Sequence, residues 1–276
     1  MLRNFLLPFA VVLAVAAPAG ARRPRAHPAS AGSVQPAAPA PAPCLQFYLA
    51  GQPPVETAPG ADERLFCHSF YATNYSTSRR DPIWTSYHLT AAMARASDAF
   101  DRHSRTFAPQ DSLAAALQGS HNDFENPPFD RGHLTPDNDA PDLPQQADTY
   151  VVTNIVPQIS GFNEGLWSRL EKATHKLAES ERELYIVTGS IFGPSRPPMN
   201  GITVPSALYK AIYAPSRGFA LAFISTNANP TVCRIVAIAE IKRQAGVDPF
   251  PSLPAPVKAR LPAMPPRWGN FPRACR

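Results

Sequence analysis

The stretch F-D-R-G-H-L-T-P at residues 129–136 places an acid, a cation, a glycine and an imidazole in four consecutive positions. Asparagine and proline residues stand on both sides of this stretch. We therefore expect a turn-like setting, where functional side chains tend to lie. The chain contains no G-x-x-x-x-G-K-[ST], H-E-x-x-H or G-x-S-x-G motif, so this stretch is the strongest indication of chemistry in the sequence.

A second polar cluster follows, with T-N-I-V-P-Q at 153–158 and N-E-G-L-W-S-R-L-E at 163–171. On a helix, with about 100° per residue, Asn163 falls close to the direction of the two leucines of this segment, and Glu171 falls at the edge of the same stripe. An amide on the buried side needs a polar partner, because an unsatisfied buried amide is unfavourable. Two hypotheses stay open: a hydrated hard cation is that partner, or Asn163 caps the helix.

Hydrophobic patterns around these clusters predict the fold class. Five runs rich in Val, Ile, Tyr and Phe are typical of strands: 150–156, 184–192, 207–214, 219–226 and 233–239. Two segments are typical of helices: 88–99 and 163–181. The last three strand candidates follow one another with no helix between them. The pattern therefore predicts an α+β fold with an antiparallel sheet.

The two ends of the chain differ in composition from the part between them. Residues 1–21 combine a positive charge at Arg3, a 13-residue apolar stretch and an A-G-A site, which together are typical of a signal peptide. Residues 22–43 then form a Pro/Ala-rich basic leader, and residues 249–276 form a Pro-rich basic tail. We expect the folded domain at 44–248 and an exported protein, either periplasmic or secreted.

Basic residues at both ends account for the positive net charge. The whole chain carries +5, from 26 Lys and Arg against 21 Asp and Glu, yet neither end contains an acid. Residues 44–248 are left with a net charge of −4, so the overall charge is weak evidence for a nucleic-acid partner. A hydrophobic share of 44% excludes a wholly disordered chain. No apolar run reaches the ~20 residues of a membrane span, so we expect a soluble mature protein.

The chain has four cysteines and no C-x-x-C pair: Cys44, Cys67, Cys233 and Cys275. In an oxidising compartment two disulfides are the default. Three pairings are possible, and proximity in the sequence favours Cys44–Cys67 and Cys233–Cys275. The second disulfide would tie the basic tail back to the folded domain.

D-R-G-H, then T-N-x-x-P-Q, then N-x-G-x-W-x-x-L-E together resemble the DNA/RNA non-specific endonuclease family. These are the ββα-metal (His-Me finger) nucleases that include secreted bacterial nucleases and mitochondrial endonuclease G. The resemblance covers roughly residues 44–248 and extends to R-T-F at 105–107 and Y-K at 209–210. It implies a ββα-metal nuclease fold, α+β in class, with a central antiparallel sheet flanked by helices.

The resemblance also implies roles for individual residues. His133 resembles the general base of the family, and Arg131 resembles its phosphate-contacting arginine. Asn154 resembles the amide that supports the site near the histidine. Asn163 resembles the single direct protein ligand of a divalent cation, normally Mg²⁺, and Glu171 resembles the carboxylate that orients metal-bound waters.

Four further positions have expected roles, the first two from the resemblance and the other two from residue type. Arg105 resembles the upstream arginine on the scissile phosphate, with Arg102 as the alternative. His175 stands four residues after Glu171, where several relatives carry an arginine that stabilises the leaving group. The chain departs from the family at this point. Asp130 is expected to brace the D-R-G-H segment, and Trp167 is expected in the core.

These residue types suit phosphodiester hydrolysis. Imidazole titrates near neutrality and can take a proton from water, and arginine holds phosphate bidentately. Mg²⁺ prefers oxygen ligands and keeps several waters, and contacts to phosphate give no sequence discrimination. We expect a secreted endonuclease that cleaves both DNA and RNA, uses Mg²⁺ with Mn²⁺ or another divalent cation as a substitute, and leaves 5′-phosphate ends.

Two alternatives stay open at this point: a phosphodiesterase for small nucleotides, and a catalytically inactive nuclease-like protein that binds nucleic acid or the cell envelope through its basic tails. The joint presence of His133, Asn163 and Glu171 argues against the inactive protein. Digestion of long nucleic acid would separate an endonuclease from a phosphodiesterase.

Overall fold

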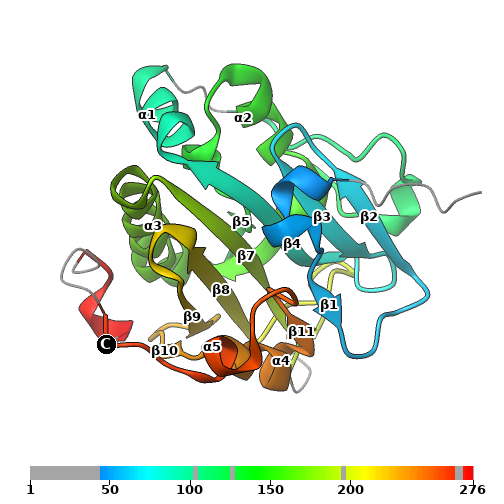
Figure 1. The fold of residues 1–276 in the computed structure, drawn as a ribbon. Coiled ribbons are helices and arrows are strands. Elements are labelled where there is room, and N and C mark those ends of the chain that lie inside the picture. Colours follow the sequence, from blue (N-terminus) through cyan, green and yellow to red (C-terminus); the bar gives the residue numbers. More distant parts are fainter. Residues whose placement is uncertain (1–43, 102–104, 125–127, 194–196, 265–269, 276) are drawn as a thin grey trace, which may run out of the picture. The chain divides into compact units, whose positions relative to one another are not determined.

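A seven-stranded antiparallel sheet forms the centre of the fold (Figure 1). The computed structural model describes residues 44–101, 105–124, 128–193, 197–264 and 270–275. Neighbouring strands follow the order β10 (Cys233–Val236), β9 (Phe219–Thr226), β8 (Ala207–Ala214), β7 (Glu183–Ile191), β4 (Asp81–Thr90), β3 (Tyr71–Ser76) and β2 (Glu63–Cys67). Every neighbouring pair runs antiparallel, which confirms the predicted α+β class.

Helices and turns cover both faces of this sheet (Figure 1). One face packs against α1 (Ala91–Ala99), the π-helix Gly161–Trp167 and α3 (Ser168–Glu181). The other face packs against α4 (Ile238–Ala245), α5 (Ala255–Ala259) and the 3₁₀ turns Leu45–Phe47 and Leu49–Gly51. Because side chains alternate along a strand, β8 sends Leu208 into the first layer and Tyr209 into the second.

A separate ribbon of β5 (Phe129–His133) and β6 (Ile155–Ile159) precedes the π-helix and α3. Strand, strand and helix together form the ββα unit that the resemblance implied. The D-R-G-H residues lie on β5, so the predicted turn-like setting is wrong. The flanking prolines and asparagines misled that prediction, because the backbone from 129 to 133 pairs residue by residue with β6. A short helix, α2 (Leu143–Thr149), lies between the two strands in sequence.

Several other predicted elements have different boundaries in the structure: the strand expected at 184–192 is Glu183–Ile191, and the helix expected at 163–181 is the π-helix Gly161–Trp167 followed by α3. The helix expected at 88–99 begins at Ala91, because Thr90 ends β4 and caps the helix by accepting a bond from Met93 N at 3.2 Å. The strand expected at 150–156 is a 3₁₀ turn, Val152–Asn154, that leads into β6.

The strand expected at 233–239 ends early. It stops at Val236, and α4 starts at Ile238. Ile238 and Ile241 are three residues apart and both are buried, so the apolar pattern changes from the strand period to the helix period at this point. A two-stranded pairing of β1 (Val55–Glu56) with β11 (Val247–Asp248) follows that helix.

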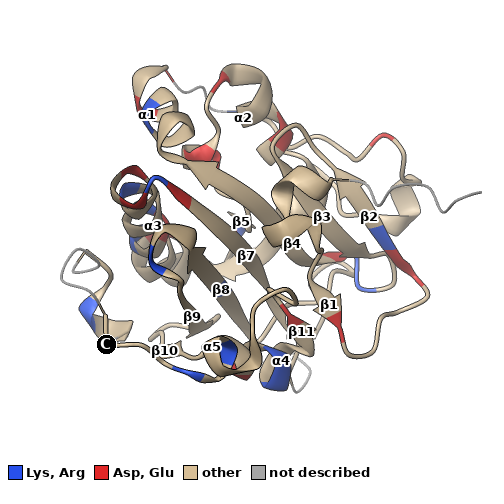
Figure 2. Cartoon of the chain, viewed as in Figure 1, with Lys and Arg blue, Asp and Glu red and all other residues tan. Residues whose placement is uncertain are grey.

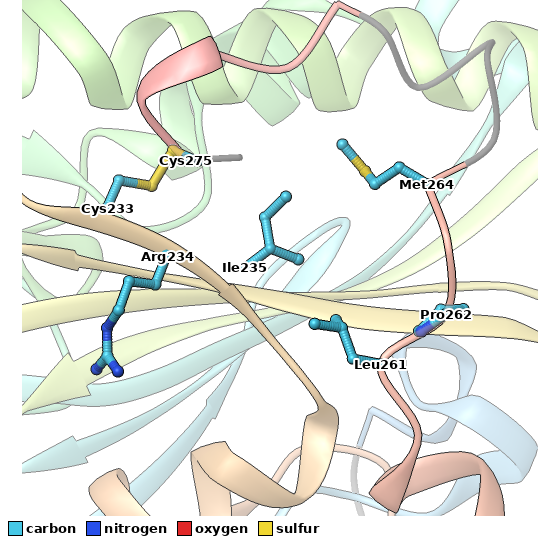
Figure 3. Close-up of a pocket in the computed structure, with 7 residues that line it drawn as sticks. All are labelled: Cys233, Arg234, Ile235, Leu261, Pro262, Met264 and Cys275. Atoms are coloured by element: carbon cyan, nitrogen blue, oxygen red, sulfur yellow. A yellow bond between two sulfur atoms is a disulfide. The ribbon is translucent and has the colours of Figure 1, made fainter.

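The two favoured disulfides, Cys44–Cys67 and Cys233–Cys275, are both confirmed. The second one joins the C-terminal segment to β10, and Phe271 of that segment packs on Phe223 with 4.7 Å between ring centroids. A hollow of about 490 Å³ lies beside this disulfide. Figure 3 shows side chains that line it, such as Leu261. None of the D-R-G-H side chains lines this hollow. It is therefore not the candidate catalytic centre.

The predicted signal peptide at 1–21 and leader at 22–43 lie outside the described residues. Figure 2 shows Lys and Arg interspersed with Asp and Glu on the ribbons, without one uniformly basic side in this view. Among the described helices, none has both the length and the apolar character that crossing a bilayer requires.

Candidate active site

The β5–β6 ribbon sets the position of the D-R-G-H side chains. In its register, Asp130 lies opposite Gln158 and His133 lies opposite Ile155. Position 132 requires glycine, because a Cβ atom there would lie 2.2 Å from the Gln158 side chain. The close approach lets the Gln158 amide donate a bond to the His133 carbonyl at 3.3 Å. The backbone on both sides of the histidine is thus fixed by its own ribbon.

His133 lies at the end of β5 among aromatic rings. Its ring centroid is 5.4 Å from that of Phe107 and 4.9 Å from that of Tyr150. Burial lowers the pKa of His133 to about 4, while the charge of Asp137 opposes this shift. Among the described residues, its buried Nε2 has no hydrogen-bond partner. The imidazole is therefore neutral near pH 7, with a ring nitrogen that the protein does not engage.

Asn154 braces the segment that follows His133. Its Oδ1 accepts a bond from Thr135 N at 2.9 Å, and its Nδ2 donates to the Thr135 and Thr149 carbonyls at 2.9 Å each. The side chain is completely buried. Asn154 thus uses its amide on the backbone and fixes the chain next to the histidine.

Asn163 and Asp130 form a pair that connects the π-helix to β5. Asn163 Nδ2 donates to Asp130 Oδ2 at 3.0 Å, and Ser160 Oγ donates to Asp130 Oδ1 at 2.5 Å. Asn163 lies within Gly161–Trp167, so the hypothesis that it caps the helix is wrong. Asp130 uses both carboxylate oxygens to hold donors, in agreement with the bracing role expected from the sequence. Because the nitrogen of Asn163 faces Asp130, its carbonyl oxygen faces away from that acid.

Glu171 lies in the first turn of α3, near a buried lysine that the sequence analysis gave no role. Burial raises the pKa of the Glu171 carboxyl group, and the charge of Lys210 opposes this rise. Glu171 Oε1 is buried without a hydrogen-bond partner among the described residues. Lys210 is completely buried and donates to Thr188 Oγ1 at 2.9 Å. Two signals were available in the sequence: the Y-K pair of the resemblance at 209–210, and the position of this lysine inside the apolar run 207–214.

The two arginines lie differently with respect to His133. The Arg131 guanidinium lies 5.5 Å from the ring centroid of Phe107, the ring that also faces His133. Arg105 donates to the Leu143 carbonyl at 3.2 Å and to Gln146 Oε1 at 3.5 Å, so it is held against α2. Its competitor, Arg102, lies outside the described residues. The structure thus brings Arg131 to the histidine and ties Arg105 to the neighbouring helix.

His175, the departure from the family pattern, lies between acids. Its Nδ1 is 2.8 Å from Asp139 Oδ1, and its Nε2 is 3.3 Å from Asp98 Oδ1. Burial opposes protonation, but the bond and the charge of Asp139 outweigh it and raise the pKa of His175. Tyr87 OH donates to the other oxygen of Asp139 at 2.7 Å. Both ring nitrogens of His175 face carboxylates, and Nδ1 is hydrogen-bonded to Asp139.

The oxygen atoms of Asn163 and Glu171 fit a hard divalent cation. Asn163 is held through its nitrogen, which leaves its Oδ1 as the donor, and Glu171 offers a buried carboxylate oxygen. Across the part of the chain that the structure describes, no group of three or more His, Cys, Asp or Glu side chains could hold a metal. The donor set therefore suits an ion that keeps several waters, as Mg²⁺ does.

A ββα unit with a neutral histidine on its ribbon and an asparagine on its helix defines the class of the protein, a ββα-metal nuclease. The model of the DNA/RNA non-specific endonuclease family matches residues 54–255. The chain therefore belongs to the DNA/RNA non-specific endonuclease family, a family of divalent-metal-dependent hydrolases.

Individual relatives agree with this assignment. Nuclease C1 of Cunninghamella echinulata var. echinulata is 28% identical over 170 residues, which cover 57% of this chain and 68% of the relative. The mitochondrial nuclease EXOG of Danio rerio is 27% identical over 217 residues, which cover 70% of this chain and 62% of the relative. The chain thus spans about two thirds of the length of these two relatives.

The fold also has a counterpart among solved structures. A chain of the crystal structure of the EndoG/EndoGI complex, described as the mechanism of EndoG inhibition, superposes with a TM-score of 0.61 at 26% sequence identity. The superposition covers 70% of this chain and 89% of that chain. The ββα-metal nuclease fold expected from the sequence is therefore confirmed.

Proposed function

We propose that this protein is an exported, Mg²⁺-dependent endonuclease that hydrolyses DNA and RNA without sugar or sequence preference. One observation carries the proposal: β5 holds the neutral His133 at its end and, through Asp130, the amide of Asn163. One strand and the helix bonded to it thus supply both a base that can take a proton from water and an oxygen ligand for a hard cation. Membership of a DNA/RNA endonuclease family supports both substrates.

In this proposal His133 activates the attacking water. Its Nε2 accepts a proton from the water molecule while the water oxygen bonds to phosphorus. The P–O3′ bond breaks and O3′ takes a proton from solvent water, so the products carry 5′-phosphate and 3′-hydroxyl ends. Asn154 and Gln158 hold the backbone next to His133 and so keep the imidazole in place.

Arg131, Asn163 and Glu171 act on the charge of the phosphate. Arg131 extends from the same strand as His133 and offers guanidinium donors to the phosphoryl oxygens. Asn163 would hold the divalent cation directly, and Glu171 would hold it through water. When bound, the cation offsets the negative charge that develops on the leaving oxygen. Because all of these contacts address phosphate, they do not distinguish one base from another.

Two features support export. All four cysteines form disulfides, which are typical of proteins in oxidising compartments. The composition of residues 1–21 is that of a signal peptide. Intact mass of the secreted protein tests this part: we expect a chain that starts near Arg22 and has no thiol to alkylate before reduction.

Digestion of supercoiled plasmid and of a long RNA tests the activity. We expect both to be degraded in Mg²⁺ or Mn²⁺ and neither in EDTA, with 5′-phosphate ends that a ligase accepts. His133→Ala should abolish most of this activity. A matched control is His88→Ala, since His88 pairs with Glu183 at 2.7 Å on the sheet, away from the ribbon.

The alternatives give different results in the same assay. Hydrolysis of a small phosphodiester such as bis(p-nitrophenyl) phosphate, with plasmid and RNA left intact, would replace the endonuclease with a small-nucleotide phosphodiesterase. Binding of plasmid with no hydrolysis of either substrate would indicate a nuclease-like binding protein and would contradict the proposal.

A further inference from the structure

Asn227 stands directly after β9, and its side chain is completely buried. Its Oδ1 accepts a bond from Ile159 N at 2.8 Å, and its Nδ2 donates to the carbonyls of Pro157 and Pro205 at 2.8 Å and 3.0 Å. An amide nitrogen carries two hydrogens, so both donors and the acceptor of this side chain are in use. Asn227 lies outside the three sequence motifs, yet two of its three bonds reach β6, a strand of the active-site ribbon.

These two bonds cover the outer edge of β6. In the two-stranded ribbon β6 pairs with β5 along one edge, and the open edge of a strand presents unpaired backbone groups. The Ile159 N–H and the Pro157 C=O are the two groups that one peptide unit of a neighbouring strand would engage. The Asn227 amide engages both, and proline at position 157 has no N–H that would be left over at such an edge. Asn227 therefore takes the place of a third strand and joins the ribbon to the central sheet.

The bonded stretch leads into the corner between the ribbon and the π-helix. Ile159 ends β6, and the π-helix begins two residues later. Between them, Ser160 Oγ donates to Asp130 Oδ1 at 2.5 Å, and the other oxygen of this acid accepts the bond from Asn163 Nδ2 at 3.0 Å. The corner that Asn227 holds is therefore connected, bond by bond, to the amide proposed to bind the cation.

The turn that carries Asn227 also supports the helix side of the corner. A Cβ atom at Gly161, the first residue of the π-helix, would lie 2.8 Å from Asn229 Nδ2, so this turn packs closely against the helix start. The turn is closed by two bonds: Thr226 N donates to the Val232 carbonyl at 2.9 Å, and Val232 N donates to Thr226 Oγ1 at 2.8 Å. The corner thus lies against a braced turn of the central sheet.

We propose that Asn227 is a positioning residue of the active site, whose side-chain amide fixes the corner between β6 and the π-helix against the central sheet and so holds Asn163 in place to bind the divalent cation. This inference rests on the proposed function, since it supports the cation ligand that this function requires. It adds to the site a residue from the turn between β9 and β10, which otherwise contributes nothing to the ββα unit.

Metal affinity separates a positioning residue from one that only stabilises the fold. Loss of a partner that orients a metal ligand reduces metal affinity by about 10–100-fold in general. Loss of an equally well bonded side chain elsewhere lowers the free energy of unfolding, but it leaves the affinity of the folded form unchanged. The matched control is therefore a second buried amide with the same number of backbone bonds.

Gln118 supplies that control. Its amide accepts from Gln110 N at 2.6 Å and donates to the carbonyls of Gln110 and Leu113 at 3.1 Å and 2.6 Å. All three bonds stay within the segment 110–118. Gln118→Ala should therefore lose stability and bind Mg²⁺ as the unaltered chain does.

Calorimetric titration of the full chain with Mg²⁺ tests the proposal through binding alone. We expect Asn227→Ala to weaken Mg²⁺ affinity by at least about tenfold. Asn227→Asp, which keeps the size of the side chain and an acceptor for Ile159 N but loses the amide donors, should weaken it as well. The Mg²⁺ concentration for half-maximal plasmid cleavage should rise in the same variants. In an Asn163→Ala background, Asn227→Ala should cause no further loss of affinity, because the ligand it positions is gone.

Amide hydrogen exchange gives a readout that needs no metal. In folded Asn227→Ala, exchange at Ile159 N and in the π-helix should be faster by about tenfold, the factor that corresponds to one lost hydrogen bond. Amides of β7 and β8 should keep their rates. Equal acceleration of all these amides would indicate a global loss of stability and would overturn the positioning role.

The remaining outcomes also decide the question. Equal or tighter Mg²⁺ binding by folded Asn227→Ala, or by folded Asn227→Asp where the alanine variant fails to fold, overturns the role of Asn227 alone. Failure of both variants to fold in thermal unfolding assigns Asn227 to folding and overturns that role too. Absence of both Mg²⁺ binding and cleavage in the unaltered chain overturns the proposed function and this inference together.

Discussion

The surroundings of His133 and of His175 are opposite in kind. At the end of β5, His133 faces aromatic rings and its buried Nε2 has no hydrogen-bond partner among the described residues. At the contact between α1 and α3, both nitrogens of His175 face carboxylates. Burial lowers the pKa of the first histidine, and Asp139 raises the pKa of the second. Burial favours the neutral form of the first imidazole, and Asp139 favours the protonated form of the second.

A single 3₁₀ turn, Asp137–Asp139, connects the two regions. Asp137 interacts with His133, and Asp139 binds His175. A histidine at position 175 can therefore fix the turn that follows the catalytic strand without taking part in the chemistry. The comparison shows that the role of a histidine in this chain cannot be assigned from its residue type alone. The role depends on the acids that surround each ring.

The largest effect is expected from His133→Ala. The variant loses the proton acceptor but keeps the residues proposed to hold the cation, so turnover should fall by about 10²–10⁴-fold while Mg²⁺ and DNA binding persist. Plasmid-cleavage rates together with binding isotherms measure this. If His133→Ala kept nearly unaltered turnover at neutral pH, His133 would not be the general base, and its role would not differ from that of His175 in the way described.

Asn163→Ala should have a smaller and partly reversible effect. It removes the one direct protein ligand proposed for the cation, so cleavage should fall at low Mg²⁺ and recover in part as the Mg²⁺ concentration rises. Cleavage measured across a Mg²⁺ titration shows this for Asn163→Ala and not for His133→Ala. The same Mg²⁺ dependence in both variants would show that the two side chains do not have separate roles.

His175→Asn should affect stability rather than chemistry. Because folding raises the pKa of His175, its ion pairs stabilise the protein fully below the unfolded-state pKa of about 6.5 and lose this effect as the pH rises through the higher folded-state pKa. We expect a loss in the free energy of unfolding of about 1–3 kcal/mol near pH 6 and a smaller loss near pH 9. Urea unfolding at both pH values measures it.

The control for this prediction is His88→Asn. His88 pairs with Glu183 on a partly exposed part of the sheet, where a pair contributes at most about 1 kcal/mol. A loss of stability at His175 that grows toward pH 9 would contradict the stabilising role of its ion pairs. A large loss of kcat without loss of stability would show that His175 takes part in catalysis.

The sequence motifs indicated residues that the structure places on one ββα unit, but they did not predict all of the local structure around them. Three motifs with fixed spacing indicated His133 and Asn163, and the strands 207–214 and 219–226 have the predicted boundaries. The D-R-G-H strand was missed, because the hydrogen bonds to β6 that make it a strand join residues far apart in the chain.

Lys210 and His175 show where sequence reasoning ends. The direction of the Asn163 amide is set by a hydrogen bond to Asp130, 33 positions away in the chain, which the sequence does not reveal. The charge state of Lys210 and of His175 depends on Glu171 and Asp139, which come close only in the folded chain. Such contacts leave no periodicity or spacing for a sequence pattern to report.

The pH dependence of cleavage tests most directly the claim that a neutral, unengaged His133 takes the proton from water. Single-turnover rates on a DNA duplex at saturating Mg²⁺ are measured from pH 5.5 to 9 for the unaltered chain and for His133→Ala. With a His133 pKa of about 4, the unaltered chain should show a nearly flat profile, because the base is already deprotonated throughout. His133→Ala should start far lower and rise with pH by up to about tenfold per unit, as hydroxide replaces the activated water. A profile of the unaltered chain that falls about tenfold per unit below pH 7, or a His133→Ala rate equal to that of the unaltered chain, would contradict the account.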